Sequence, residues 1–497
     1  MKNKEIKNIL LASCGIFMMT ACTDLINNEK DTIVAVSDGD GFAAGDPTEL
    51  LISAYKDLGA YTDQGNIYAL GQHPTAEMIP PTRGVDWGDN GVWRTLDQHT
   101  WDATHSAVLG AWNQLNERAY KCNEIIASNP SPAQKAEAQF LRALNMFHVM
   151  DYWGKVPFRE VTEGVDVDPR VLTRTEAFDF IVSDLEAAVS GLDAMGPQPL
   201  QAKANKAAAN FLLAKLYLNK AVYTAASPAG PYSFDNGDMA KVIGYVDAII
   251  ADGYAINDDF FSNFTEDEGN TETILNSAEG TPQNRWMMTL HYDQNPSGWN
   301  GFTTLADFYD TFEDGDIRKG LPAEADGTDM SGIGFGFLIG QQYDDNGDPI
   351  TDSRSKNLLK FTRDVTLAGT PTDKGIRAIK YHPARAGKYI LMRFAEAYLM
   401  KAEAMMRSGD TSGALAMIND LRAKRDAQSL SSLDENSMFE EIGRELYWEG
   451  GKRTTEVRFG KYTTGTGTLI QDDYTILYPI PSSAIVSNPN LEQNEGY

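Results

Sequence analysis

The sequence is poor in cysteine and in positive charge, and each shortage argues against a class of protein. Its 497 residues include only three cysteines, Cys14, Cys22 and Cys122, so no disulfide framework is available to hold the fold. Cys122 lies on a helical pattern and is most simply a small residue of the core. Lys and Arg number 43 against 70 Asp and Glu, a formal net charge of −27. Such an acidic surface repels phosphate backbones, so the composition argues against binding to nucleic acid.

Familiar catalytic and metal-binding motifs are also missing. The six histidines show no paired metal spacing, no Gly-x-Ser-x-Gly elbow occurs, and residues 332–336 lack the spacing of a dinucleotide fingerprint. Residues 344–349 begin like a calcium loop, but Pro349 stands where an EF-hand needs Gly, and Ser355 replaces its closing Glu. A turn explains that stretch better. We therefore predict no cofactor and no metal.

The longest apolar run is short and stands at the start of the chain. Residues 9–20 follow three lysines and are too few to span a membrane permanently, so residues 1–21 are predicted to be a signal segment. The segment ends in MMTAC, which resembles the lipobox of bacterial lipoproteins with Cys22 as the acylated residue, although Met19 stands where Leu is commoner. The alternative is an ordinary secretory signal cut near Ala21. Acylation would anchor the chain to a membrane without crossing it.

The rest of the chain is predicted to be a tether and one domain. Residues 22–45 mix charge, Asn and Gly with little periodicity, as expected of a lipidated tether that precedes the fold. The mature chain has ordinary apolar content, which is enough for one large core or for two intimate subdomains, and we predict that residues 46–497 form a single domain. Nothing in them looks like a second membrane-spanning segment.

The helical patterning is clearest in residues 388–426, which predict two helices folded back on each other. In the first, apolar side chains recur every three or four residues, and alanines leave room for a neighbouring helix. Gly409 suits the left-handed cap that ends this helix, and Asp410 or Thr411 can cap the next one. A helical hairpin of this tetratricopeptide type cannot bury its apolar face alone, so further helix pairs are expected.

Further helical stripes predict a mostly α fold with about four such pairs. The first stripe begins at Pro47, and strong start signals follow at Ser131 and in the capping box of Thr173 with Glu176. The other stripes cover residues 111–126, 203–223, 239–252 and 437–449. The helical core is therefore expected at about 46–253 and 388–460, with an irregular C-terminal segment at 461–497.

A long stretch, residues 254–387, separates the two helical parts. It is rich in Gly, Asp, Thr and aromatic residues and has no sustained helical stripe. Short apolar runs such as residues 286–292 suit brief strands and loops. We expect this stretch to be a loop-rich insertion.

Several segments of the chain carry a family resemblance. They are AEAQFLRA at 136–143 with DYWGKVP at 151–157, RFAEAYLMKAEA at 393–404, ELYWEG at 445–450 with EVRFG at 456–460, and YPIP at 478–481 with the closing NPNLEQNEGY. In this order they resemble the SusD/RagB family of lipoproteins. The resemblance implies tetratricopeptide hairpins, an outer-membrane lipoprotein that faces outward, and a SusC-like TonB-dependent transporter as partner. It also implies a nutrient receptor, commonly for glycans, and not an enzyme.

The residues needed to bind a neutral sugar occur in two loop regions. Sugars present apolar C–H faces and a rim of hydroxyls, so a receptor needs exposed aromatic rings flanked by polar groups. The predicted ligand-binding residues are Arg83, Trp87, Asp89, Asn90 and Trp93 from the first region and Trp286, Tyr292 and Trp299 from the insertion. For each tryptophan the alternative is burial under a loop. Trp112, Trp153 and Trp448 belong to core segments and are predicted to be structural.

The lipobox predicts a lipid-anchored protein, and the family resemblance implies that it is exposed at the surface of the outer membrane. It would capture an oligosaccharide and pass it to the SusC-like transporter. The alternatives are a receptor for a peptide or another nutrient, a scaffold without a ligand site, and a surface glycoside hydrolase. The hydrolase is the least favoured, because among 70 acidic residues some carboxylates always lie near one another.

Overall fold

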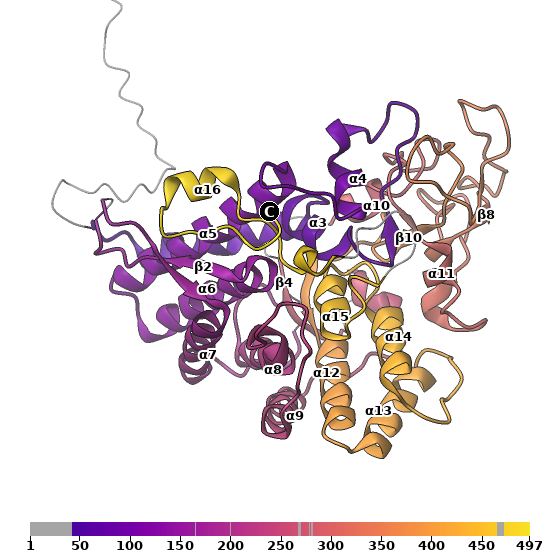
Figure 1. Ribbon diagram of the computed structural model, residues 1–497. Helices are drawn as coiled ribbons and strands as arrows, with labels where there is room; N and C mark the ends of the chain where they lie inside the picture. The colour runs from indigo at the N-terminus through magenta and orange to yellow at the C-terminus, as the bar shows by residue number, and fades with distance from the viewer. Residues whose placement is uncertain are drawn as a thin grey trace, which may run out of the picture.

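The computed structural model describes residues 42–164, 166–198, 200–266, 270–277, 279, 282–464 and 472–497. Figure 1 shows that helices dominate the molecule and that the insertion, around α10 (Asn284–Met287), α11 (Ala306–Tyr309) and β8 (Gly340–Gln341), lies on the side away from α7 (Arg174–Gly191). The predicted signal segment, Cys22 and nearly all of the tether lie outside the described residues. No described helix is long and apolar enough to cross a membrane.

Long helices of the N-terminal part pack side by side in chain order. They are α2 (Pro47–Lys56), α5 (Ser106–Ala127), α6 (Pro132–Trp153), α7, α8 (Lys206–Tyr223) and α9 (Asn236–Ala251), and from α5 to α9 each consecutive pair is in contact. The start signals work as predicted. Ser131 and Gln134 form the capping box of α6, and Thr173 and Glu176 form that of α7. These contacts confirm the predicted run of helices, and the tetratricopeptide comparison stays a prediction.

The C-terminal hairpin consists of α12 (Phe394–Arg407) and α13 (Thr411–Ala423), and α12 packs against α8 and α9. Gly409 adopts a φ of +96°, and the Asp410 carboxylate accepts a hydrogen bond from the Gly413 amide, as the sequence predicts. The start of the hairpin was predicted wrongly. Its first residues form the strand β11 (Ile390–Arg393), because β4 (Thr273–Asn276) of the insertion pairs with them antiparallel.

Shorter elements complete the fold, and most of them carry too few residues for a periodic signal. The short helices are α3 (Asn66–Gln72), α4 (Val92–Asp97), α14 (Glu435–Leu446), α15 (Lys452–Arg458) and α16 (Ser482–Ser487), of which α14 was predicted. A hairpin of β2 (Lys155–Phe158) and β3 (Arg170–Thr173) follows α6. The C-terminal segment, predicted to be irregular, contains the helix α16, and it packs on α6, where Trp153 Nε1 donates to the Pro479 carbonyl over 3.1 Å.

The insertion carries short strands, as expected, and two of them pair with strands outside it: β5 (Thr303–Thr304) with β1 (Met78–Ile79), and β4 with β11. The other strands pair within the insertion, β10 (Arg377–Ile379) with β7 (Phe335–Leu338), β7 with β6 (Gly320–Leu321), and β8 with β9 (Lys360–Phe361). In the first pair Met78 faces Thr304 and Ile79 faces Thr303. Because β1 belongs to the N-terminal part, this pairing brings residues 82–93 beside residues 285–302.

Ion pairs without solvent access fix the insertion to the C-terminal helices. This buried ion cluster consists of Glu272, Asp316, Arg318, Arg393, Arg422, Arg425, Glu441 and Glu445. Arg318 of the insertion contacts Asp316 and Glu441, each at 2.7 Å, and Glu445 at 3.1 Å. Burial of a charge is tolerated only when it is paired and hydrogen-bonded, and here each charge has a partner.

Candidate ligand-binding surface

The two predicted loop regions meet in a shallow, open groove of 610 Å³. We call it the aromatic groove, and its lining residues are Gln64, Asp86, Trp87, Asp89, Trp93, Tyr292, Gly298, Trp299 and Arg354. It therefore contains five of the eight predicted ligand-binding residues. The pairing of β1 with β5 explains the meeting, since each loop region adjoins one strand of that pair.

Aromatic rings form a continuous surface along the groove. The ring centres of Trp87 and Trp93 lie 5.8 Å apart, and those of Trp87 and Trp299 lie 6.3 Å apart. Trp299 is 36% exposed, whereas Trp87 and Trp93 are half-buried. Phe302 packs beneath them, with its ring centre 4.8 Å from that of Trp87. The groove thus offers ring faces to solvent while its rings are supported from below.

The indole N–H groups of Trp87 and Trp93 are already bonded within the protein. Trp87 Nε1 donates to the Trp299 carbonyl over 2.9 Å, and Trp93 Nε1 donates to Asp89 Oδ2 over 2.5 Å. Both bonds fix the orientation of the rings. These indoles therefore offer a ligand their apolar faces and not their donors.

Trp87 has an unusual backbone that the surrounding residues hold in place. Its φ is +61°, a conformation that bulky residues rarely adopt. A Cβ at Gly301 would lie 2.4 Å from the Trp87 indole, so the ring packs directly against this glycine. Residues kept in such strained conformations concentrate at binding sites. This geometry favours a role for Trp87 beyond packing.

Arg83 and Trp286 do not line the groove, which corrects the prediction for both. Trp286 is 7% exposed within α10 and belongs to the core. Arg83 is 2% exposed, and its guanidinium donates to the backbone carbonyls of Gly301, Pro371 and Lys374. Burial lowers the pKa of Arg83 to about 10. Arg83 thus connects the first loop region to the insertion from beneath.

The remaining predictions for single residues have mixed outcomes. Asn90 is exposed on the turn next to Asp89 but does not line the groove. The tryptophans assigned to the core are buried, with Trp112 and Trp448 4% exposed and Trp153 0% exposed. Cys122 is buried in the main core, as predicted.

Arg354 and Asp86 are groove residues that the sequence analysis did not select. Arg354 Nη1 donates to Asp86 Oδ2 over 2.7 Å, and its guanidinium carbon lies 4.1 Å from the centre of the Tyr292 ring. The two residues come from segments far apart in the chain. No local pattern distinguishes Arg354 from other exposed arginines, so only the tertiary structure reveals its place.

His291, Asp293 and Asp352 lie close enough to hold a metal ion, with ligand atoms within 4.8 Å of one another. The histidine spacing could not show this, because Asp352 comes from a distant turn. The carboxylates already accept hydrogen bonds, from the amides of Ser353 and Arg354 and the hydroxyls of Ser355 and Thr372. These bonds give the trio a structural role in the turn at 352–355, and we assign no metal to it.

The acidic stretch at 344–349 is a turn, as its sequence indicates. Asp344 Oδ1 accepts hydrogen bonds from the amides of Asn346 and Asp348, each at 2.9 Å. A carboxylate that caps its own loop in this way is satisfied without a cation.

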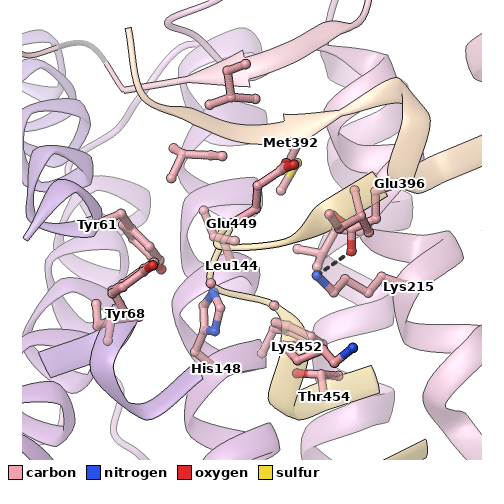
Figure 2. A pocket seen from close by; sticks show the side chains of 18 of the residues that line it. Tyr61, Tyr68, Leu144, His148, Lys215, Met392, Glu396, Glu449, Lys452 and Thr454 are labelled. Carbon is pink, nitrogen blue, oxygen red and sulfur yellow. Dashed lines mark ion pairs between the residues drawn. The ribbon is translucent and has the colours of Figure 1, made fainter. Parts of the chain in front are cut away.

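A second, deeper cavity of 90 Å³ lies among α6, α8 and β11. Figure 2 shows Tyr61, His148, Lys215 and Glu396 around it, and Lys215 Nζ lies 2.8 Å from the Glu396 carboxylate. Burial, with Lys215 acting in the same direction, lowers the pKa of His148 to about 3. Pockets for larger organic ligands measure about 300 Å³ or more. The aromatic groove is therefore the better candidate for an oligosaccharide.

The fold and the groove define a class: a mostly helical protein with a loop-rich insertion and an open aromatic surface. Two family models match the chain, "SusD family" over residues 260–471 and "Starch-binding associating with outer membrane" over residues 84–218. The chain belongs to the SusD/RagB family.

Individual relatives agree with this assignment. The starch-binding protein SusD of Bacteroides thetaiotaomicron is 25% identical over all of both chains. Among solved structures, surface glycan-binding protein A from Bacteroides fluxus is 20% identical, with a TM-score of 0.66 over 91% of this chain and 100% of its own. A laminarin-binding SusD-like protein is 18% identical, with a TM-score of 0.64 over 91% of this chain and 99% of its own. These proteins are named for binding and not for catalysis.

Proposed function

We propose that this protein is a cell-surface receptor that captures an oligosaccharide in the aromatic groove. The observation that carries the proposal is the meeting of Trp87, Trp93 and Trp299 with Tyr292 in one open depression. Ring faces bind the apolar faces of pyranosides, and the flanking carboxylates, amide and guanidinium can bond their hydroxyls. The relatives named for starch and laminarin binding support a glycan as ligand.

The proposal includes a lipid anchor and a partner. Acylation of Cys22 would hold the receptor at the outer membrane, and the tether would place the groove away from the lipid. The captured glycan would then pass to a SusC-like TonB-dependent transporter. The association with the outer membrane in the name of one matching family model supports this location.

The groove favours binding over hydrolysis. Its two carboxylates are each engaged, Asp86 with Arg354 and Asp89 with the Trp93 indole. A glycosidase needs one carboxyl group that is free to give a proton and a second that attacks or activates water. The hydrolase alternative predicts new reducing ends when the protein is incubated with a glycan, and the receptor predicts unaltered ligand.

Replacing Trp299 by alanine tests the site. The side chain is exposed, and its backbone carbonyl still accepts the Trp87 hydrogen bond in the variant, so we expect the melting temperature to stay within about a degree. Loss of one stacking face should weaken binding by about 1.5 kcal/mol, roughly tenfold. Isothermal titration with maltoheptaose, laminarihexaose and other neutral oligosaccharides measures this loss.

Tyr343→Ala is the matched control, because Tyr343 is an equally exposed aromatic residue of the insertion, 42% exposed, that does not line the groove. It should bind as the wild type does. If the Trp299 variant binds the ligand as tightly as the wild type does, the ligand does not bind in the aromatic groove. No binding to any glycan of the panel would favour the scaffold or the receptor for another nutrient.

A further inference from the structure

The rim of the aromatic groove carries one guanidinium group, and its position matters for the charge of the ligand. Arg354 has a side chain 53% exposed, and it extends over Tyr292 from the insertion side. A guanidinium beside an aromatic face is well suited to a uronic acid, because the ring can stack while the carboxylate receives two parallel hydrogen bonds. Taken alone, Arg354 would mark the groove as a site for acidic glycans.

Asp86 changes this expectation. Its carboxylate accepts the hydrogen bond from Arg354 Nη1 over 2.7 Å, so it neutralises the guanidinium and takes one of the donors that a uronate would need. Asp352, the other acid near Arg354, is 1% exposed and is engaged by its own turn. Asp89 adds a second exposed carboxylate to the groove, whose lining thus has two acids and one base. Charge and geometry both oppose an anionic ligand.

We propose that Asp86 is a specificity-determining residue, which neutralises Arg354 and restricts the groove to uncharged glycans. The inference rests on the proposed function and names its substrate class: neutral oligosaccharides are accepted, and oligouronides are rejected. The rejection has two parts, the occupied guanidinium and the repulsion by the carboxylates of the groove. Specificity commonly depends on such a repulsive element as well as on attractive contacts.

The side chain of Asp86 can be changed without changing the loop. The turn at 83–86 is closed by backbone hydrogen bonds, from the Arg83 amide to the Asp86 carbonyl over 3.0 Å and from the Asp86 amide to the Arg83 carbonyl over 3.1 Å. Neither bond involves the carboxylate. Asp86→Asn therefore keeps the shape of the groove while it removes the charge that neutralises Arg354.

The experiment compares the full-length wild type with Asp86→Asn by isothermal titration at low salt. The probes are a neutral pair, maltoheptaose and laminarihexaose, and an acidic one, hexagalacturonate. We expect the variant to gain about tenfold or more in affinity for hexagalacturonate, the size of one new charge-assisted contact, so that its preference for hexagalacturonate over the neutral probe that binds rises by a similar factor. Because the new contact is exposed, salt should screen it. At about 0.5 M salt we expect most of the gain in affinity to be lost.

Two controls isolate the cause of the gain. Glu324→Gln removes the same charge from another exposed pair, Glu324 with Arg385 at 2.9 Å, whose members do not line the groove, and it should gain nothing. The double variant Asp86→Asn/Arg354→Gln lacks the freed guanidinium and should also lose the gain.

Each outcome is decisive. A wild type that binds hexagalacturonate as tightly as the neutral probes, or an Asp86→Asn variant that gains no affinity for it, overturns the inference and leaves the receptor function intact. A gain that persists in the double variant shows that Arg354 is not the group involved, and this also overturns it. If neither the wild type nor Trp299→Ala binds any of the glycans, the proposed function is wrong, and the inference that rests on it is wrong too.

Discussion

Among single residues, Gly301 is as important to the groove as the rings themselves. The Trp87 indole packs against the Cα of Gly301, and the Met288 carbonyl lies on the same side, 2.8 Å from where a Cβ would be. The indole cannot move inward, because Phe302 and Trp93 already contact it. A side chain at position 301 must therefore displace Trp87 toward solvent.

We predict that Gly301→Ala weakens glycan binding about tenfold, because Trp87 loses the orientation that its hydrogen bond to Trp299 requires. The overpacked site should also lose about 1–3 kcal/mol of unfolding free energy. Isothermal titration and urea unfolding measure the two effects. Gly244→Ala, in α9, is the control and should bind normally, because a Cβ at Gly244 would meet open space. Normal binding by Gly301→Ala would show that the Trp87 ring does not contact the ligand.

For single residues, the sequence predicts which residue types form the groove, but it does not predict how far each side chain is buried. Trp87 and Trp299 were recognisable because Gly, Asp and Asn surround them, which is typical of exposed loops. Trp286 lies in the same stretch as Trp299, yet it faces the core because a short helix forms there. Arg354 carried no signal, since its function depends on Asp86 and Tyr292, which the fold brings to it.

Among the elements, α14 carries two carboxylates of the buried ion cluster, those of Glu441 and Glu445, that bind Arg318 of the insertion. Glu445, near its end, receives hydrogen bonds from three buried arginines, Arg318, Arg393 and Arg425, over 2.9–3.1 Å. Burial alone would raise the pKa of Glu445, but these guanidinium groups hold it well below its usual range. The carboxylate is therefore charged and shared between β11, the insertion and the turn that follows α13.

We predict that Glu445→Gln destabilises the protein by about 3–5 kcal/mol, because it leaves buried guanidinium groups without a counter-charge. Urea unfolding followed by circular dichroism gives the free energy. Glu440→Gln, one turn away on the same helix, loses only an exposed partner of Arg444 and should cost less than about 1 kcal/mol. Similar values for the two variants would contradict the importance of the buried ion cluster.

The buried ion cluster shows which properties of a helix can be predicted from its own residues and which cannot. Arg422 and Arg425 were expected only as cations that suit the end of a helix, and α13 does end there. Their burial follows from partners in α14 and in the insertion, which no local pattern contains. For the same reason β11 was predicted as helix: its apolar spacing fits both structures, and the pairing with β4 decided between them.

For the whole molecule, the burial of His73 makes the free energy of unfolding depend on pH. His73 is 0% exposed beneath the groove, between the rings of Trp93 and Phe302, and neither of its ring nitrogens has a hydrogen-bond partner among the described residues. Burial, with Arg285 acting in the same direction, lowers its pKa to about 3. The unfolded chain therefore takes up a proton near pH 6.5 that the folded chain refuses until much lower pH.

We predict that His73→Phe makes the protein less sensitive to acid. The lowered pKa means that His73 reduces stability progressively as the pH falls below about 6.5, by about 1.4 kcal/mol per pH unit, and phenylalanine removes this linkage. The ring should fit its aromatic surroundings without a new unpaired group. Urea unfolding at pH 7, 6 and 5 measures the slopes, and parallel curves for wild type and variant would contradict the assignment.

By itself, the sequence determined the helical fold, the family and the kind of surface that the protein presents. Helix periodicity, caps and aromatic loops are local, so they can be seen in short stretches of chain. Only the tertiary structure decided which aromatic rings face solvent, that β1 and β5 bring the two loop regions together, and that Asp86 neutralises Arg354. Those outcomes depend on contacts between residues hundreds of positions apart, and no local pattern encodes which distant groups will meet.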